Sequence, residues 1–177
     1  MLIFFIVLII KQFLFAQVEI GTFPIKNFSI KDYNAQAQNW AVLQDNRGII
    51  YVGNKDGLLE FDGTTWSKLS ITNESDVRSI AVDSKGRIYI GAVSEIGFVE
   101  PNPFGQIEYK SLINKIPSND LDFLDVWKTF ANSTGIYFQS NNKIFRYSND
   151  TLHIWNAETS FHNSFMVNNR LFVNQSN

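Results

Sequence analysis

The sequence contains no cysteine. This absence excludes a disulfide framework, a thiol nucleophile and any zinc site with cysteine ligands. Charged residues are also scarce, at 18% of the 177 residues, and they leave a net charge of -2 with acids and bases scattered along the chain. A nucleic-acid-binding protein needs a basic patch or stripe, so the composition predicts that this segment binds no nucleic acid.

Helical periodicity is missing as well. No stretch after the N-terminal apolar segment places apolar side chains at helical spacing over three turns. Aromatic residues are abundant instead, with 16 Phe, 6 Tyr and 4 Trp. Aromatic and β-branched side chains pack well on pleated surfaces, so the composition predicts an all-β protein.

A short sequence motif occurs three times in the chain, and a fourth copy begins after them. The copies are residues 45–53 (DNRGIIYVG), 83–91 (DSKGRIYIG), 132–138 (NSTGIYF) and, in degraded form, 167–173 (VNNRLFV). A period of about 35 to 48 residues, with strand-like runs in each unit, is typical of a β-propeller. The repeat therefore indicates the architecture before any single residue is interpreted.

Each repeat divides into four strand-like runs, which is the content of one antiparallel propeller blade. The expected blades cover approximately residues 39–72, 77–115, 123–157 and, incompletely, 162–177. The expected fold class is thus all-β, with about three and a half blades. Because known propellers close with roughly four to eight blades, we expect an N-terminal piece of a longer protein. A small β protein complete at 177 residues is the alternative.

The turn residues repeat with the blades. Asp45, Asp83 and Asn132 begin three turns, and Gly48, Gly86 and Gly135 follow them three residues later. Asp or Asn at the first position and Gly at the fourth are the preference of a type I turn. The side chain accepts a backbone hydrogen bond, and Gly adopts the left-handed conformation that restarts the strand. We interpret all six residues as structural.

Residues 1–17 are interpreted as a signal peptide. Residues 2–10 are unbroken aliphatic and aromatic, and the small residue Ala16 precedes the change in polarity. This pattern is typical of secretory signals. A retained anchor is the alternative, although the run is shorter than the roughly 20 residues of a spanning helix. We expect export to the periplasmic or extracellular side of the cytoplasmic membrane, with residues 18–38 leading into the propeller.

Trp40, Arg78 and Trp127 occupy matching places in the three repeats, at the start of the innermost strand. A propeller lines its central funnel with this strand, so these residues are the predicted ligand-binding site. The indoles would stack on a sugar ring, and Arg78 would hydrogen-bond a polar or acidic group. The alternative is that all three side chains pack between blades. No cofactor is expected.

The sequence predicts no metal site. His153 and His162 lie in different segments without partners at ligand spacing, and a metal site needs three convergent ligands. The acidic run of Asp120, Asp122 and Asp125 offers carboxylate oxygens to calcium. It lacks the Gly and terminal Glu of a calcium loop, so we interpret it as a solvated loop.

No catalytic site is predicted either. One residue separates Asp from Gly in the Asp-box of sialidase-type propellers, whereas two residues separate Asp45 from Gly48 and Asp83 from Gly86. There is no nucleophilic serine motif and no glycine-rich phosphate loop, and Gly53 and Gly57 are interpreted as turn glycines. A propeller polysaccharide lyase or glycosidase, with its acids in later blades, stays open as an alternative.

The amino-acid sequence of the first repeat resembles the two-component-regulator propeller repeat. The resemblance is carried by residues 38–45 (QNWAVLQD), 51–54 (YVGN), 57–63 (GLLEFDG) and Trp66, and by the lead-in residues 23–28 and 32–33. It implies an extracytoplasmic sensor in which propellers are followed by a triple-tyrosine β-sandwich, a transmembrane helix and a histidine kinase or DNA-binding output domain.

The resemblance also implies partners. Several relatives respond to oligosaccharides, so the implied ligand is a small molecule of that class. The implied full protein is tethered to the membrane through a helix downstream of this sequence and acts as a homodimer. A secreted propeller scaffold for adhesion or protein interaction is the alternative from another functional class.

Overall fold

The computed structural model describes residue 21 and residues 24–176, so the expected signal peptide lies outside the described residues. Three sheets have four antiparallel strands each and follow one another along the chain. The first contains β1 (Asn39–Gln44), β2 (Ile50–Asn54), β3 (Gly57–Phe61) and β4 (Trp66–Leu69). The second contains β5 (Val77–Val82), β6 (Ile88–Ala92), β7 (Glu95–Pro101) and β8 (Ile107–Ser111). The third contains β9 (Lys128–Asn132), β10 (Gly135–Gln139), β11 (Lys143–Ser148) and β12 (Thr151–Asn156).

A two-stranded hairpin, β13 (Phe161–Val167) and β14 (Arg170–Gln175), follows the third sheet. The helical elements among the described residues are short: α2 (Ile30–Tyr33), η1 (Ile113–Lys115) and η2 (Ser118–Asp120). None of the helices in this part of the chain is long and apolar enough to cross a membrane. The prediction of an all-β chain made of four-stranded antiparallel sheets is confirmed.

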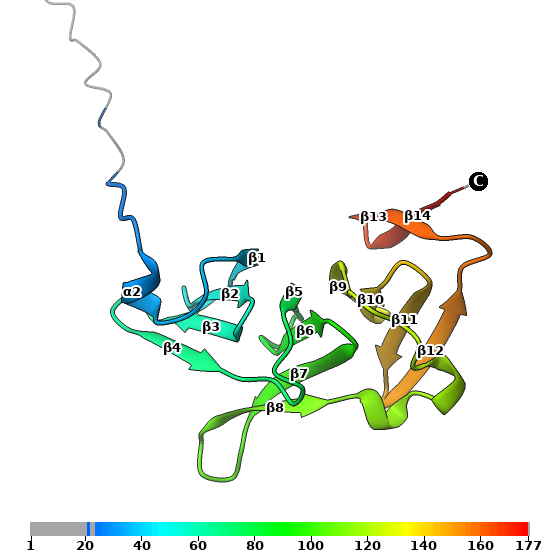
Figure 1. Cartoon of the computed structure of the whole chain (residues 1–177), viewed down its shortest axis with the longest axis horizontal. Helices are drawn as coiled ribbons and strands as arrows, with labels where there is room; N and C mark the ends of the chain where they lie inside the picture. Colours follow the sequence, from blue (N-terminus) through cyan, green and yellow to red (C-terminus); the bar gives the residue numbers. More distant parts are fainter. Residues whose placement is uncertain (1–20, 22–23, 177) are drawn as a thin grey trace, which may run out of the picture.

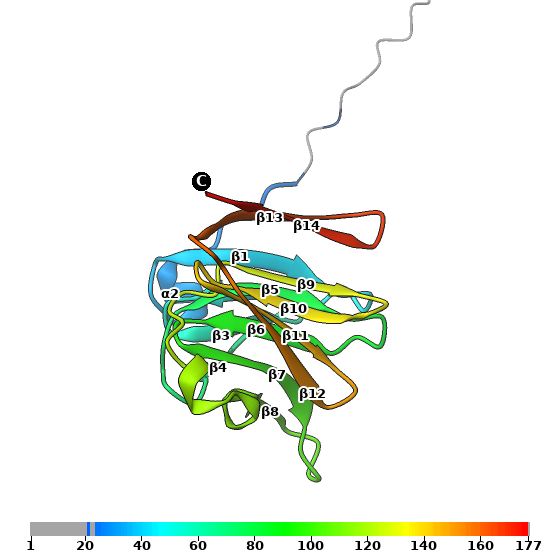
Figure 2. The same cartoon turned by 90° about the vertical axis from the view of Figure 1, so that its right-hand side faces the viewer.

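The sheets stand side by side in an open arc (Figure 1). Strands β1, β5 and β9 lie on the concave side, and β4, β8 and β12 lie on the outer side (Figure 1). Strand β1 contacts β5, and β5 contacts β9, so the first strands of the three sheets adjoin one another (Figure 2). The hairpin lies at the end of the arc, beyond the third sheet (Figure 1).

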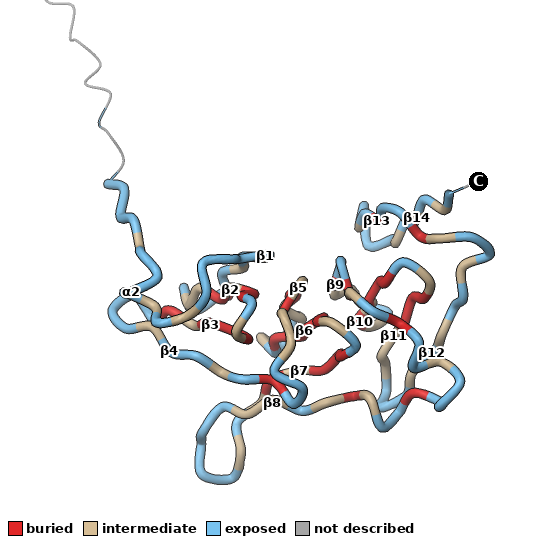
Figure 3. Tube along the Cα trace, in the orientation of Figure 1, coloured by how far each residue is buried: buried red, intermediate tan, exposed pale blue. Residues whose placement is uncertain are grey.

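Burial follows this arrangement (Figure 3). Every residue of β6 is buried because the second sheet is covered on both faces. Strand β1 at the concave edge has no buried residue, and Val42 in it is exposed. A strand that is covered on both faces is expected to have a near-continuous apolar sequence, and β6 has one.

Two hydrophobic cores lie between the sheets. The core between the first and second sheets includes Leu58, Val77 and Ile90. The core between the second and third sheets includes Phe123, Phe138 and Phe145, all of them at most 1% exposed. Each core is shared by two neighbouring sheets, so each sheet is stabilised by the next one.

The interpretation of Gly53 as a turn glycine is wrong. Gly53 lies inside β2 and not in a turn, and a Cβ atom added there would stand 2.8 Å from the carbonyl oxygen of Val77 in β5. At the matching place in β6, a Cβ on Gly91 would stand 2.5 Å from Val126. These glycines are needed because the next sheet approaches the backbone closely.

The repeated turns take two forms. Asp45 accepts hydrogen bonds from the N–H groups of Arg47 and Ile49 at 2.9 and 3.0 Å, and Gly48 has a φ of +87°. Asp83 and Gly86 repeat this arrangement.

The third turn is tighter, because Asn132 pairs directly with Gly135 across a two-residue loop. Its side-chain oxygen still accepts the N–H groups of Thr134 and Gly135.

The lead-in packs on the outer part of the first sheet. The ring of Phe28 meets Phe61 and Trp66 edge-on, at centroid distances of 4.9 and 5.3 Å. Tyr33 meets Trp66 at 5.7 Å. Trp66 is thus a packing residue that joins the lead-in to the first sheet.

Candidate functional site

The three residues predicted to bind ligand lie together on the concave side of the arc. The guanidinium carbon of Arg78 stands 3.8 Å from the ring centroid of Trp40 and 5.2 Å from that of Trp127. The two indoles meet at 6.1 Å with an interplanar angle of 69°. Trp40 belongs to β1, Arg78 to β5, and Trp127 directly precedes β9. We call these three residues the Trp–Arg cluster; it spans all three sheets.

Two carboxylates hold Arg78 in this position. Its Nε donates a hydrogen bond of 2.7 Å to Asp125. Its Nη1 lies 3.3 Å from an oxygen of Asp76, close enough for an ion pair, but it is buried and makes no hydrogen bond to any residue that the structure describes. Asp125 is itself fixed because it forms an antiparallel bridge with Val93.

This geometry changes the expected role of Arg78. Its Nε is already used by Asp125, and its side chain is only 14% exposed. Trp40 and Trp127 are each 37% exposed. A ligand on the concave side would therefore meet indole surface first, and Arg78 would orient the indoles through cation–π contact more than it would bind the ligand directly.

The acidic run has specific partners instead of being simply solvated. Asp125 pairs with Arg78, while Asp120 and Asp122 each lie 3.0 Å from the buried ammonium group of Lys143. Burial acts to lower the pKa of Lys143, but hydrogen bonds to Asp122 and Asp120 outweigh it and raise that pKa. The hydrogen bond from Lys143 lowers the pKa of Asp122. Asp120 and Asp122 thus connect the loop before the third sheet to β11, and Asp125 connects it to β5.

The histidines lie apart. His153 packs against Trp155 at a centroid distance of 4.2 Å, and His162 is exposed on β13. Within residues 24–176, no group of three or more His, Asp or Glu side chains is placed to hold a metal ion.

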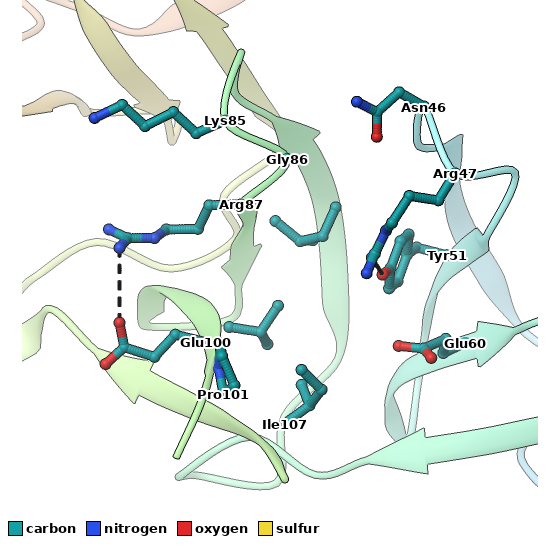
Figure 4. Close-up of a pocket in the computed structure, with 12 residues that line it drawn as sticks. Asn46, Arg47, Tyr51, Glu60, Lys85, Gly86, Arg87, Glu100, Pro101 and Ile107 are labelled. Atoms are coloured by element: carbon teal, nitrogen blue, oxygen red, sulfur yellow. Dashed lines mark hydrogen bonds and ion pairs between the residues drawn. The ribbon is translucent and has the colours of Figure 1, made fainter. Parts of the chain in front are cut away.

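A second feature is a cavity of about 680 Å³ between the first and second sheets, which we call the inter-sheet groove (Figure 4). Asn46, Arg47, Tyr51 and Glu60 line it from the first sheet (Figure 4). Opposite them lie Ile88, Val99, Pro101 and Ile107 of the second sheet, with residues 85–87 and Glu100 at the edge. The first-sheet wall is therefore polar, whereas the second-sheet wall is apolar at its centre and charged at its edge, where Lys85, Arg87 and Glu100 lie. The groove adjoins the turn at the end of β1, whereas the Trp–Arg cluster lies at its start.

Burial dominates the electrostatics of the polar wall. It raises the pKa of Glu60, and the nearby Arg47 only partly offsets this. It also raises the pKa of Tyr51, to about 12. Arg47 donates from Nε to Asp45 at 2.8 Å and from Nη2 to the Tyr51 hydroxyl at 2.9 Å.

Sequence reasoning missed the inter-sheet groove and the acids that hold Arg78. One signal for the groove was present in the repeats. The residue paired with the repeated tyrosine is Glu60 in the first sheet but Phe98 in the second. A charged residue at a position that is aromatic in the neighbouring repeat marks a place where the packing differs.

Comparison with protein-family models gives no match to this chain, and comparison with curated proteins gives none either.

Proposed function

We propose that the three sheets and the hairpin are consecutive blades of an extracytoplasmic β-propeller. The support is the repeated sequence motif, the four-stranded antiparallel sheets in chain order and the side-by-side contact of their first strands. These are the features of propeller blades arranged around a common axis. The resemblance to the two-component-regulator propeller repeat supports the same assignment.

We further propose that this propeller senses a small ligand, of the oligosaccharide class, for a transmembrane regulator. The observation that carries the proposal is the Trp–Arg cluster, which places two half-exposed indoles at the concave edge. Flat aromatic surfaces with a few fixed polar groups suit a sugar ring. In this proposal the segment is non-catalytic and works by binding.

Signalling would follow from a population shift. Trp40 and Trp127 come from different sheets, and Arg78 from the sheet between them. A ligand that contacts both indoles would bind best at one relative placement of the three sheets, and would favour it by its differential affinity. In the full protein, this shift would be passed to an output domain across the membrane.

Calorimetric titration of the chain with a panel of neutral and acidic oligosaccharides tests the proposal. We expect one member to bind, and Trp40→Ala to weaken it by about tenfold or more, the effect of losing roughly 1.4 kcal/mol of contact energy. Trp155→Ala is the matched control, since this indole is 39% exposed but lies on β12 away from the cluster.

Two results would count against this function. Unfolding of both Trp40→Ala and Arg78→Ala would show that the cluster packs the sheets together. A folded protein that binds no oligosaccharide would favour the scaffold alternative.

A further inference from the structure

The inter-sheet groove exists because two aromatic residues are missing from it. Between the second and third sheets, Phe98 stacks on Tyr147 at a centroid distance of 6.2 Å and an interplanar angle of 18°. Phe98 pairs with the repeated tyrosine Tyr89, and Tyr147 follows the residue paired with Tyr137.

In the gap between the first and second sheets, the matching residues are Glu60 and Val99. Glu60 pairs with the repeated tyrosine Tyr51 as Phe98 pairs with Tyr89, and Val99 follows Phe98 as Tyr147 follows Arg146. A carboxylate and a small side chain thus replace two stacked rings. The resulting cavity of about 680 Å³ has the size of small-molecule sites.

The carboxylate of Glu60 has no partner of its own. Across residues 24–176 it makes no hydrogen bond and no ion pair, and the guanidinium of Arg47 is held by Asp45 and Tyr51. A half-buried charge normally has a partner, because its desolvation is costly. Figure 4 shows Glu60 directed into the groove, with Ile107 and Pro101 across from it.

We propose that the inter-sheet groove binds a small organic ammonium ion with an apolar body. The ammonium group would donate to Glu60, and the body would lie on the exposed Pro101 and Ile107, next to the buried Ile88 and Val99 that also line the groove. The Tyr51 hydroxyl accepts a hydrogen bond from Arg47 and donates to none of the described residues, so its proton would donate to a polar group on the ligand. The inference is independent of the proposed function, since it concerns other residues at the other end of the strands.

The probe is 2-phenylethylammonium, compared with 2-phenylethanol and phenylacetate, which have similar bodies but no positive charge. Binding is followed by the methyl NMR signals of Ile88, Val99 and Ile107 in the intact chain. We expect the ammonium ion to shift these signals and the alcohol and the acid to bind more weakly, by about tenfold or more, because hydrogen bonds to charged groups are the stronger ones.

Two variants separate charge from shape. Glu60→Gln should weaken the ammonium probe by about tenfold or more, whereas Glu108→Gln on β8, outside the groove, should leave it unchanged. Val99→Tyr should abolish binding, because it restores one of the rings that fill the second gap. Equal binding of the alcohol, no effect of Glu60→Gln, or no methyl shifts at millimolar probe would overturn the proposal.

Discussion

The carboxylate of Asp45 accepts hydrogen bonds from two backbone N–H groups and from the Nε of Arg47, and its side chain is fully buried. Burial acts to raise its pKa, but the hydrogen bonds from Arg47 and Ile49 outweigh it, so the pKa lies below its usual 3.8. One side chain thus fixes the turn between β1 and β2. In the turn between β9 and β10, the neutral side chain of Asn132 likewise accepts two backbone hydrogen bonds.

This comparison predicts different costs for two substitutions. Asp45→Asn keeps one acceptor oxygen for the turn N–H groups and loses the hydrogen-bonded ion pair with the largely exposed Arg47, so it should cost about 1 kcal/mol at pH 7. Asp45→Ala leaves the turn N–H groups without their acceptor and should cost about 1–3 kcal/mol. Urea unfolding of the two variants measures both values.

The pH dependence has a definite sign. A lowered folded-state pKa means that the carboxylate contributes stability that is complete above its usual 3.8 and is lost as the pH falls through the lower folded value. The difference between wild type and Asp45→Asn should therefore shrink in acid. A difference that stays constant down to pH 3 would contradict the role given to the charge.

At the scale of elements, strands β5 and β9 are brought together by small residues. Ser79 donates to the carbonyl of Val126 at 2.7 Å, and its hydroxyl lies 2.7 Å from that of Thr129. Gly91 leaves room for this contact, since its missing Cβ would meet all three residues within 2.7 Å. The first strand of each sheet can approach its neighbour because a glycine lies beside it.

We predict that Gly91→Ala destabilises the protein by about 1–3 kcal/mol, the usual cost of overpacking. A methyl of Val126 is the atom nearest to the added Cβ, at 2.5 Å. Gly91→Ala should therefore cost less in a Val126→Ala background than in the wild type. Additive effects of the two substitutions in urea unfolding would show that the two sites do not share this space.

For the molecule as a whole, each hydrophobic core is shared by a pair of neighbouring sheets. The second sheet contributes to both cores, whereas the hairpin β13–β14 has only two strands and leaves Phe165, Val167 and Phe172 at least half exposed. Its contact with the third sheet includes a buried hydrogen bond from Ser164 to Gln139. Local stability should therefore fall from the second sheet toward the hairpin.

Amide hydrogen exchange measures this gradient. We expect the slowest exchange in β3, β5, β6 and β7, which carry the most buried residues, and the fastest among the strands in β13 and β14. Equal protection of the hairpin and β6 would mean that the whole chain unfolds as one unit.

Much of this architecture could be predicted from residue types alone. Turn residues such as Asp45 and Gly48 act within a few residues of the chain, and strand-like runs act through their own pattern, so both are visible as local sequence. The meeting of Trp40, Arg78 and Trp127 was also predictable, because equal places in equal repeats come together at one edge.

The partners of these residues were not predictable in the same way. Arg78 is held by Asp125, which lies 47 residues away in a loop, and Gly53 needs its small size because of Val77 in the next sheet. Such contacts depend on how the sheets are placed, and no local pattern encodes that placement.

The sequence by itself determined the all-β class, the repeat and the chemistry of the turns, because each depends on short-range backbone preferences. Only the tertiary structure decided that the gap holding Glu60 and Val99 is open while the gap holding Phe98 and Tyr147 is filled. The reason is physical: a cavity depends on the summed volumes of side chains from two sheets, and neither sheet specifies it alone.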